Sequence, residues 1–361
     1  MRIGIIGAGQ LGRMLALAGY PLGMRFMFLD RTEQTPAAPL GDSVVGDFDD
    51  PESLAELVAQ SDILTFEFEN VSAPALDTLP DHPPLWPPAS ALYYAQDRLH
   101  EKTLFAELDI ATAPSQPVED LEGLRSAVAN LGLPAVLKTR RLGYDGKGQM
   151  VLRANADVER AWESLGGMEL LLEKLIPFEF EVSLVGVRST RGETAFYPLT
   201  RNHHEGGILR HSVAPYENAE LASHARGALD RIMQRLTYVG VLTVEFFVYE
   251  GRLLANEMAP RVHNSGHWTI EGAVTSQFEN HLRAIAGLPL GNTAVTGHSA
   301  MVNFIGRMPD RAAVLSLPNC HLHDYGKSAR PGRKLGHATA VCTSAQARDD
   351  ALKRLISLDL R

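Results

Sequence analysis

The chain has 361 residues, of which 45% are hydrophobic and 21% charged, the proportions of a globular protein with two or three domains. There are 34 lysines and arginines and 43 aspartates and glutamates, so the formal charge is 34 − 43 = −9, which disfavours sequence-independent binding to nucleic acids. Two cysteines without CxxC spacing, a first segment unlike a signal peptide, and the lack of a run of about 18 apolar residues indicate a cytoplasmic protein without a membrane span.

Predicted strands and helices divide the chain into three domains. Residues 1–98 alternate short apolar strands with helices, which predicts an α/β domain with a Rossmann-like parallel sheet. Residues 99–289 predict a larger α+β domain, and residues 290–361 a small C-terminal domain of short strands closed by a helix. The fold class is therefore mixed α/β and α+β.

The first motif is the glycine-rich turn Gly7–Gly12. It follows the predicted strand Arg2–Ile6 and opens the predicted helix Arg13–Gly19, and Asp30 ends the next strand. In dinucleotide-binding turns of this kind, backbone N–H groups at a helix N-terminus face a phosphate. A lone GxGxxG is a weak signal, so a nicotinamide site, a turn without a ligand and a site for another phosphorylated compound all stay open.

The second motif combines Lys138 with the loop Gly143–Gln149. Lys138 ends the predicted strand Ala135–Thr139, where its ammonium group can lie beside a phosphate. Three glycines within six residues allow the loop to move, and mobile loops over phosphates exclude water from reactive intermediates. The loop does not have the GxxxxGK[ST] pattern, and an exposed hairpin is the alternative interpretation.

The segment Glu173–Ile176 ends another predicted strand and can contact an adenine through its backbone groups, and Glu181 can bind ribose hydroxyls. Taken alone, the two glutamates are more simply interpreted as surface carboxylates.

Glu245 and Glu257 stand in two otherwise apolar strand segments. A carboxylate inside an apolar strand is costly unless it is paired or binds a metal. With Asn256 the two glutamates make an all-oxygen set, which suits Mg²⁺. The pair therefore predicts a magnesium site.

The turn at Glu250–Gly251 provides a geometric condition for this site. A two-residue turn with a regular ladder pairs Glu245 with Asn256 and sends the two glutamates to opposite faces of the sheet. A bulge or a turn longer by one residue pairs Glu245 with Glu257 and puts both on one face. We therefore expect a bulged or odd-length turn.

The segment Arg261–Trp268 follows the second glutamate strand directly. Its arginine and histidines suit an anion such as bicarbonate or phosphate, and a structural loop is the alternative. His263 and His267 have the i, i+4 spacing of a zinc pair, but no HExxH motif accompanies them.

Further along, residues 321–337 form a dense basic cluster, which predicts either a solvated loop or a site for a phosphate monoester.

Together these motifs resemble the ATP-grasp family, and within it the ligases that carboxylate 5-aminoimidazole ribonucleotide. The resemblance spans nearly the whole chain and rests on segments in the same order: Gly9–Met14, Gly143–Gln149, Asn256–Arg261, His263–Thr269 and Arg330–His337. It implies a three-part architecture, often homodimeric, with ATP between two α+β subdomains. It also implies that ATP phosphorylates bicarbonate to carboxyphosphate, and that the carboxyl group passes to the exocyclic amine of the ribonucleotide.

The resemblance assigns roles residue by residue. The implied magnesium ligands are Glu245 and Glu257. Implied contacts to ATP are Arg98, Lys138, Gly143, Tyr144, Asp145, Gly146, Lys147, Gly148, Gln149, Glu173, Lys174, Leu175, Ile176, Glu181, His204, Asn256 and Glu257. Implied contacts to the ribonucleotide and bicarbonate are Gln10, Leu11, Glu67 or Glu69, Tyr144, Arg261, His263, Asn264, Ser265, Lys327, Arg333 and Lys334, with Arg261, His263, Lys327 and Asp145 as the implied catalytic group.

Three other functions remain to be separated. Another ATP-grasp ligase, such as a formate-dependent ribonucleotide formyltransferase or a biotin carboxylase, is disfavoured by Gln10–Met14 and Asn264–Trp268. An NAD-dependent oxidoreductase leaves Glu245 and Glu257 unexplained, and a binding module would hold ATP without turnover.

The chain departs from the family pattern at Lys147, where arginine is frequent. Lysine keeps the positive charge but cannot form the bidentate hydrogen bonds of a guanidinium group.

Overall fold

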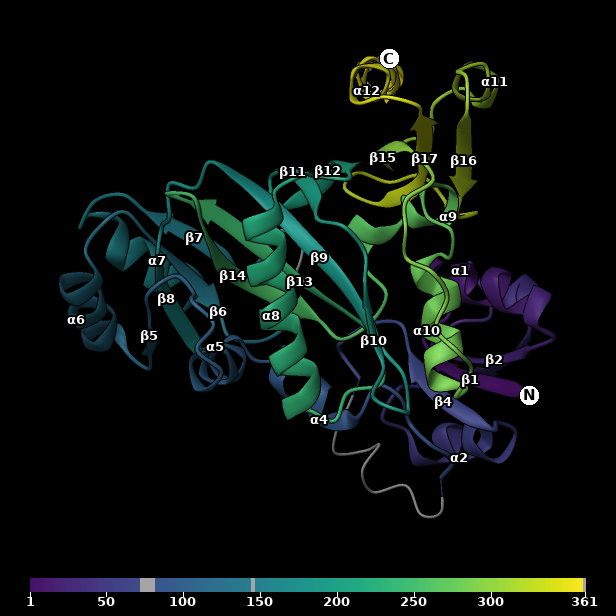
Figure 1. Ribbon diagram of the computed structural model, residues 1–361. Helices are drawn as coiled ribbons and strands as arrows, with labels where there is room; N and C mark the ends of the chain where they lie inside the picture. The colour runs from purple at the N-terminus through teal and green to yellow at the C-terminus, as the bar shows by residue number, and fades with distance from the viewer. Residues whose placement is uncertain (72–81, 144–146, 360–361) are drawn as a thin grey trace.

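The computed structural model describes residues 1–71, 82–143 and 147–359. Its strands form three sheets. Figure 1 shows the N-terminal sheet at the lower right, a four-stranded sheet with its helices at the left, and a large sheet between them that continues upward to the C-terminal helix. The predicted mixed fold class is confirmed, because a parallel N-terminal sheet is followed by two sheets built on antiparallel pairs.

The N-terminal sheet is parallel, with the strand order β3-β2-β1-β4, and helices cover both of its faces. Ile5 and Phe28 pack in the cluster that includes α1, whereas Ile6 and Leu29 pack with residues of α2. Strands covered on both faces are expected to be continuous apolar runs, as these are. The elements are β1 (Arg2–Ile6), α1 (Gln10–Gly19), η1 (Tyr20–Leu22), β2 (Arg25–Asp30), η2 (Ala38–Leu40), β3 (Asp42–Val45), α2 (Pro51–Ala59) and β4 (Ile63–Phe66).

The second sheet is antiparallel, with the order β5-β8-β6-β7, and carries two helices on one face. Helices α4 (Ala89–Ala95) and α5 (Arg98–Glu107) connect the first sheet to it. Its elements are β5 (Ser115–Val118), α6 (Leu121–Leu131), β6 (Ala135–Thr139), β7 (Gln149–Leu152), α7 (Asp157–Leu165) and β8 (Leu170–Lys174).

The central sheet has nine strands in the order β14-β13-β9-β11-β12-β15-β17-β16, with β10 paired to β9. Its strands are β9 (Phe180–Arg188), β10 (Thr194–Phe196), β11 (Thr200–Glu205), β12 (Ile208–Ala214), β13 (Gly240–Tyr249), β14 (Arg252–Ala259), β15 (His298–Ile305), β16 (Cys320–Asp324) and β17 (Lys334–Cys342). Its helices are α8 (Ala219–Arg235), η3 (Asn264–Gly266), α9 (Thr269–Gly272), α10 (Gln277–Ile285), α11 (Arg311–Leu315) and α12 (Ala345–Asp359).

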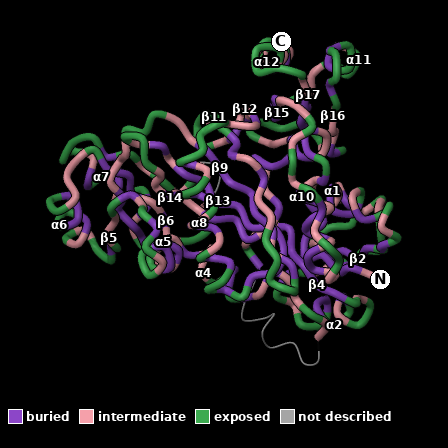
Figure 2. Tube along the Cα trace, in the orientation of Figure 1, coloured by how far each residue is buried: buried purple, intermediate pink, exposed green. Residues whose placement is uncertain are grey.

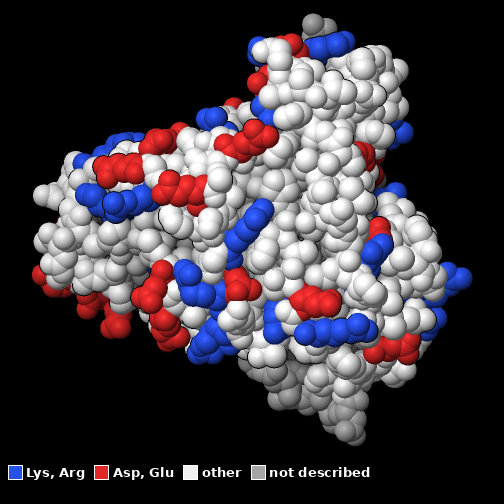
Figure 3. All heavy atoms as spheres, in the orientation of Figure 1, with Lys and Arg blue, Asp and Glu red and all other residues white. Residues whose placement is uncertain are grey.

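The C-terminal strands extend this central sheet, because β15 pairs with β12. We propose the limits 1–98, 99–289 and 290–361 as the division of the chain into domains, with the sheet continuous across the second limit. Figure 2 shows buried residues concentrated along the central strands and exposed ones on the outer helices. Figure 3 shows lysines and arginines interspersed with acidic residues over the visible face, rather than gathered into one basic patch.

In the described part of the chain, no helix combines the length and the apolar character needed to cross a membrane.

Candidate active site

A cavity of about 700 Å³ lies where the three sheets meet. The N-terminal sheet contributes the loops after β1 and β4, the second sheet contributes β6 and β7, and the central sheet contributes β13, β14 and the segment after β14. The predicted site residues among its described lining are Gln10, Leu11, Glu67, Glu69, Arg98, Lys138, Gly143, Lys147, Gln149, Leu175, Glu181, His204, Glu245, Asn256, Glu257, Arg261, His263, Asn264 and Lys334. Motifs more than 300 residues apart in the sequence therefore share one cavity.

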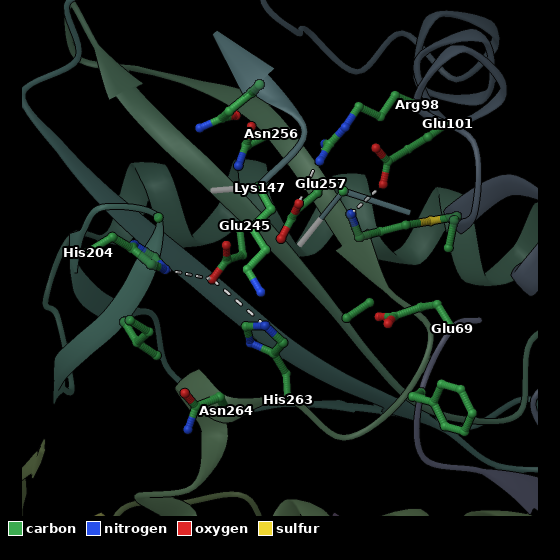
Figure 4. Close-up of a pocket in the computed structure, with 18 of the residues that line it drawn as sticks. Glu69, Arg98, Glu101, Lys147, His204, Glu245, Asn256, Glu257, His263 and Asn264 are labelled. Carbon is green, nitrogen blue, oxygen red and sulfur yellow. Dashed lines mark hydrogen bonds and ion pairs between the residues drawn. The ribbon is translucent and has the colours of Figure 1, made fainter. Parts of the chain in front are cut away.

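The strand β13 explains why Glu245 faces this cavity. Leu242, Val244 and Phe246 pack in the core built on α8, so the alternate residue Glu245 points to the opposite face of the sheet. Glu257 pairs directly with Glu245 across the ladder. Directly opposite residues in an antiparallel pair project to the same face, so both carboxylates enter the cavity, as Figure 4 shows.

The predicted pairing of Glu245 with Glu257 is confirmed. The irregularity that produces this pairing was predicted at the turn, and that location is wrong. Tyr249 pairs with Arg252, so the turn at Glu250–Gly251 has two residues, and their φ angles of 50° and 70° are those of a type I′ turn. The register shifts between Glu245 and Phe246, inside the ladder, where Asn256 is the extra residue of a bulge. The bulge therefore brings the glutamates to one face, while the turn is the ordinary one.

Glu245 lies between two histidines and lacks a hydrogen-bond partner at one oxygen. Its Oε1 atom is buried and unpartnered among the described residues, and lies 3.9 Å from both His204 Nε2 and His263 Nε2. Burial raises the pKa of Glu245 to about 7, with Glu257 and Glu181 adding to the rise and His204 opposing it. An ionised carboxylate at this position requires a nearby cation.

His204 lies between the carboxylates of Glu181 on β9 and Glu245 on the neighbouring strand β13. Its Nδ1 lies 2.8 Å from Glu181 Oε2. Burial lowers the pKa of His204, but the bond to Glu181 and the charge of Glu245 outweigh it, so the net shift is upward. Burial lowers the pKa of His263 well below its usual range, and the charge of Arg261 acts in the same direction.

Glu101 is a cavity residue that the sequence did not reveal. It stands on α5 and is 3% exposed, and its Oε1 accepts a hydrogen bond from the Met258 N–H at 2.6 Å. The Ala255 N–H donates to the Ala111 carbonyl at 2.7 Å. These two bonds hold the outer edge of β14 on both sides of the Asn256 bulge. An exposed edge would otherwise leave these N–H groups unpaired.

We expect Glu101→Gln to fold with stability close to the parent, because an amide oxygen can also accept the Met258 bond. Glu101→Leu leaves that buried N–H without an acceptor and should lower the free energy of unfolding by about 1–3 kcal/mol in urea titrations. Glu107→Leu, at the exposed end of the same helix, is the matched control for loss of a carboxylate. Equal destabilisation by both replacements of Glu101 would contradict its role at the bulge.

The same variants should differ in pH dependence in the metal-free protein. Burial raises the pKa of Glu101 to about 8 in the folded protein, whereas the unfolded chain releases this proton near 4.5. Folding therefore retains the proton, and the parent loses stability relative to Glu101→Gln as pH rises from 4.5 to about 8. Urea titrations at several pH values measure this difference, and parallel stability curves would contradict it.

Glu173 is buried, which corrects its interpretation as a surface carboxylate. Its Oε2 lies 2.8 Å from Lys138 Nζ and its Oε1 lies 3.5 Å from Lys102 Nζ. Burial alone would raise the pKa of Glu173, but the two ammonium groups outweigh it and hold the pKa low. The side chain of Glu173 therefore orients Lys138, which lines the cavity.

In Glu173–Ile176, the segment predicted to contact adenine, several hydrogen-bonding groups already have partners within the protein. The Lys174 N–H donates to the Pro114 carbonyl at 2.8 Å, and Lys174 Nζ donates to the Leu133 carbonyl at 3.3 Å. The Leu175 N–H donates to the Pro134 carbonyl at 3.2 Å. Within the described chain, the Ile176 N–H has no hydrogen-bond partner. The side chain and N–H of Lys174 therefore bond other loops, so the contact predicted for Lys174 stays a prediction, whereas Leu175 lines the cavity.

Apolar residues that sequence analysis missed complete this end of the cavity. They are Val136, Val151, Phe178 and Phe247. The rings of Phe178 and Phe247 are stacked, with centroids 4.5 Å apart and planes 11° apart. Periodicity alone does not distinguish these side chains from ordinary core residues.

The glycine-rich turn binds the protein's own carboxylates. Glu67 accepts hydrogen bonds from the N–H groups of Gly9 and Gly12, the latter at 2.6 Å, and Asp30 accepts from Ala8 at 2.9 Å. The N–H groups that would face the pyrophosphate of a dinucleotide are therefore already bonded to carboxylates. The geometry disfavours the nicotinamide interpretation.

The basic cluster contributes Lys334 to the cavity lining and Lys327 beside it. Lys327 Nζ donates to the Gln10 side-chain oxygen and lies 5.9 Å from the centre of the Tyr325 ring. Burial lowers the pKa of Lys327 to about 8, with Glu67 opposing this shift and Arg333 adding to it. The guanidinium of Arg333 donates to the carbonyl and hydroxyl of Ser328, and Arg333 is not among the residues that line the cavity, so its predicted substrate contact stays a prediction.

The segment after β14 places three predicted residues in the cavity, Arg261, His263 and Asn264, and one behind it, Ser265. Arg261 pairs with Glu69 at 2.7 Å, which identifies a partner for one of the two alternative glutamates. Asn264 exchanges two amide hydrogen bonds with Asn303, at 3.0 and 2.8 Å. Ser265 is fully buried and its hydroxyl bonds other side chains, so its position does not support the predicted contact with substrate.

Part of the glycine loop falls outside the described residues, namely Tyr144, Asp145 and Gly146. Of the remaining loop residues, Gly143, Lys147 and Gln149 line the cavity. Gly148 has a φ of 68° and packs closely on Thr139, so it shapes the loop without lining the cavity.

Comparison with known proteins identifies the family of this chain. Family models match residues 1–96 (ribonucleotide synthetase preATP-grasp domain), 103–278 (ATP-grasp domain) and 299–351 (phosphoribosylaminoimidazole carboxylase C-terminal domain). The N5-carboxyaminoimidazole ribonucleotide synthase of Pseudomonas aeruginosa is 54% identical over 359 residues, with 99% of each chain covered.

Solved structures give the same result. The crystal structure of N5-carboxyaminoimidazole ribonucleotide synthetase from Thermus thermophilus is 52% identical, with a TM-score of 0.95 over 99% of this chain and 98% of that one. An enzyme of this kind from Aspergillus clavatus, solved with ADP and 5-aminoimidazole ribonucleotide, is 29% identical, with a TM-score of 0.93 over 100% of this chain and 98% of that one. The chain belongs to the N5-carboxyaminoimidazole ribonucleotide synthase family of ATP-grasp enzymes.

Proposed function

We propose that this chain carboxylates 5-aminoimidazole ribonucleotide with ATP and bicarbonate, releasing N5-carboxyaminoimidazole ribonucleotide, ADP and phosphate in purine biosynthesis. The observation that carries this proposal is that Glu245 and Glu257 line the same cavity as Lys138, which marks the proposed nucleotide end, and as Gln10 and Lys334, which mark the proposed second end. Two ligands that must exchange a group need this arrangement.

The glutamate pair fits magnesium. Glu245 Oε1 is buried without a hydrogen-bond partner among described residues, and Glu257 projects to the same face from the facing strand. Two carboxylates and the nearby Asn256 amide supply only oxygen ligands, which Mg²⁺ prefers together with substrate phosphates. We propose Glu245 and Glu257 as its ligands. Bound Mg²⁺ would neutralise the charge that develops on the transferring phosphoryl group.

The nucleotide end is built for ATP. Lys138, fixed by Glu173, and Arg98, whose Nη1 lies 3.8 Å from Glu257, supply positive charge for phosphates. Glu181 and His204 offer polar groups to a ribose, and the apolar wall around Phe247 suits a purine ring. ATP use agrees with the ADP and ATP complexes of similar proteins.

At the other end we propose that Gln10, Leu11 and Glu67 contact the ribonucleotide and that Lys327 and Lys334 neutralise its phosphate. Arg261 and His263 also line the cavity, and we propose that they hold bicarbonate against the γ-phosphate. One bicarbonate oxygen attacks that phosphorus and ADP leaves, and the carboxyphosphate then transfers its carboxyl carbon to the amine and releases phosphate. Exclusion of water by the bound ligands would protect this short-lived acyl phosphate from hydrolysis. The catalytic role of Asp145 stays a prediction from the resemblance.

One assay tests the proposed function. The protein is incubated with ATP, Mg²⁺, bicarbonate and 5-aminoimidazole ribonucleotide, and ADP release is followed with each component omitted in turn. We expect full turnover only with all four. ADP release that ignores the ribonucleotide, or that requires formate in place of bicarbonate, would reject the proposal in favour of another ATP-grasp ligase.

We further propose a cytoplasmic homodimer. Both cysteines, Cys320 and Cys342, are free thiols, as expected in a reducing compartment. Light scattering at micromolar concentration measures the assembly, and a mass equal to one 39.4 kDa chain would reject the dimer.

A further inference from the structure

A chain of buried polar side chains leads from β12 to His263 beneath the cavity. Ser212, Asn202 and Ser183 lie on the neighbouring strands β12, β11 and β9, and Ser265 in η3 follows them. Successive hydrogen bonds measure 2.8, 3.0 and 2.7 Å, and Ser265 Oγ lies 2.8 Å from His263 Nδ1. None of the four side chains lines the cavity, and each is at most 5% exposed.

The direction of these hydrogen bonds is determined at the His263 end. The Ser265 backbone N–H, which can only donate, points to His263 Nδ1 at 3.3 Å. Nδ1 therefore accepts and carries no proton, so the Ser265 hydroxyl also donates to it. The Ser265 oxygen then accepts from Ser183, the Ser183 oxygen accepts from the Asn202 amide N–H, and the Asn202 carbonyl accepts from Ser212. One polarity satisfies the whole chain.

We infer that this chain of side chains holds His263 as the neutral tautomer with its proton on Nε2, so that His263 offers the cavity a hydrogen-bond donor and not a general base. With Nδ1 as an acceptor, the only proton of the neutral ring is on Nε2. Figure 4 shows this edge of the ring directed toward Glu245. Ser265, Ser183, Asn202 and Ser212 are thus positioning residues for His263.

The backbone of His263 is fixed as firmly as its ring. The His263 N–H donates to Gln277 Oε1 at 3.0 Å, and Gln277 Nε2 donates to the His263 carbonyl at 2.6 Å. A donor held in this way needs no reorganisation when negative charge develops in front of it. The inference rests on the proposed function for the identity of its acceptor, an oxygen of the carboxyl or phosphoryl group in transfer.

His204 provides an internal contrast on the same carboxylate. Its Nδ1 lies 2.8 Å from Glu181 Oε2, and an ionised carboxylate only accepts, so here Nδ1 carries the proton. When neutral, His204 therefore presents a bare Nε2 to Glu245, whereas His263 presents Nε2–H. The two histidines are not equivalent, although both Nε2 atoms lie 3.9 Å from Glu245 Oε1.

Nitrogen NMR of the protein labelled with ¹⁵N-histidine tests the tautomer without any turnover. Long-range proton–nitrogen correlations distinguish the two neutral forms, and the His263 signals are those absent from His263→Gln. We expect the Nε2–H pattern in the parent and a measurable Nδ1–H population in Ser265→Ala, because that variant loses the 2.8 Å hydroxyl bond to Nδ1 and keeps only the longer backbone N–H bond of 3.3 Å. Ser299→Ala, which removes a fully buried hydroxyl outside the chain of side chains, should leave the pattern unchanged. An Nδ1–H pattern in the parent, or an identical pattern in Ser265→Ala, would overturn the inference.

Turnover tests the donor role. The amide N–H of glutamine reaches close to the position of Nε2, so His263→Gln should keep about a tenth of the parent kcat, whereas His263→Ala and His263→Glu should lose about 100-fold or more. Ser265→Ala should lower kcat about tenfold with little change in the KM for ATP. Equal losses in the Gln and Ala variants would contradict the donor role of His263. If the parent fails to turn over, the proposed function fails, and the NMR result still decides the tautomer.

Discussion

Glu257→Gln is expected to reduce magnesium-dependent ATP turnover by about a thousandfold while the protein stays folded. The change removes one of the two anionic oxygens opposite each other on β13 and β14 but keeps the size of the side chain. Metal and electrostatic contributions to a developing phosphoryl charge have this magnitude. The Glu257 side chain is 45% exposed, so its loss leaves the core intact. Steady-state ADP release over a range of Mg²⁺ concentrations measures the effect.

Glu250→Gln is the matched control, because Glu250 stands in the turn of the same hairpin, away from the cavity. It should retain parental turnover and parental dependence on Mg²⁺. Parental activity in Glu257→Gln would remove that residue from the metal site. A circular dichroism spectrum shared by all three proteins would exclude unfolding as the cause of a loss.

Lys327→Met is expected to lower kcat/KM for the ribonucleotide by about 100-fold and to leave the KM for ATP nearly unchanged. Lys327 bonds Gln10 at the proposed ribonucleotide end of the cavity. A charge-assisted bond to a phosphate or oxyanion in a dry site contributes on this scale. Lys353→Met, an exposed lysine on α12, is the control. An unchanged kcat/KM in Lys327→Met would contradict the proposed contact.

The pH dependence of kcat/KM for the ribonucleotide offers a second test of the role of Lys327. The pKa of Lys327 is lowered to about 8, so its ammonium is present below that pH and is lost above it. We expect kcat/KM for the ribonucleotide to fall above pH 8 in the parent. In Lys327→Arg the guanidinium stays charged, so this fall should move to higher pH. A pH profile shared by the parent and the Arg variant would exclude Lys327 as its source.

Much of the fold could be predicted because it depends on local signals. The predicted strands Arg2–Ile6 and Ala135–Thr139 have the observed bounds of β1 and β6, and both carry strong apolar patterns. Strands β11 and β12 were missed, because their polar residues face a buried network and not an apolar core. Pairing between distant strands, such as β12 with β15, has no local signature.

The site was predictable in composition but not in its supporting contacts. Glu245 and Glu257 were found because a carboxylate in an apolar strand is unusual. Their register required a bulge, but the sequence could not place it at Asn256, since two bonds on the outer edge of β14 hold it there. Glu101 supplies one of these bonds from a helix more than 150 residues away. Contacts of this kind follow from tertiary packing alone.

The fate of one bicarbonate oxygen tests the central claim most directly. If the cavity holds bicarbonate against the γ-phosphate of ATP, an oxygen of bicarbonate becomes bonded to phosphorus and stays there when the carboxyl carbon moves to the amine. Turnover in ¹⁸O-labelled bicarbonate, stopped before the label exchanges with water and analysed by ³¹P NMR, should give phosphate that carries one ¹⁸O atom. Unlabelled phosphate would contradict the account, because the γ-phosphate would then have passed to water or to another acceptor.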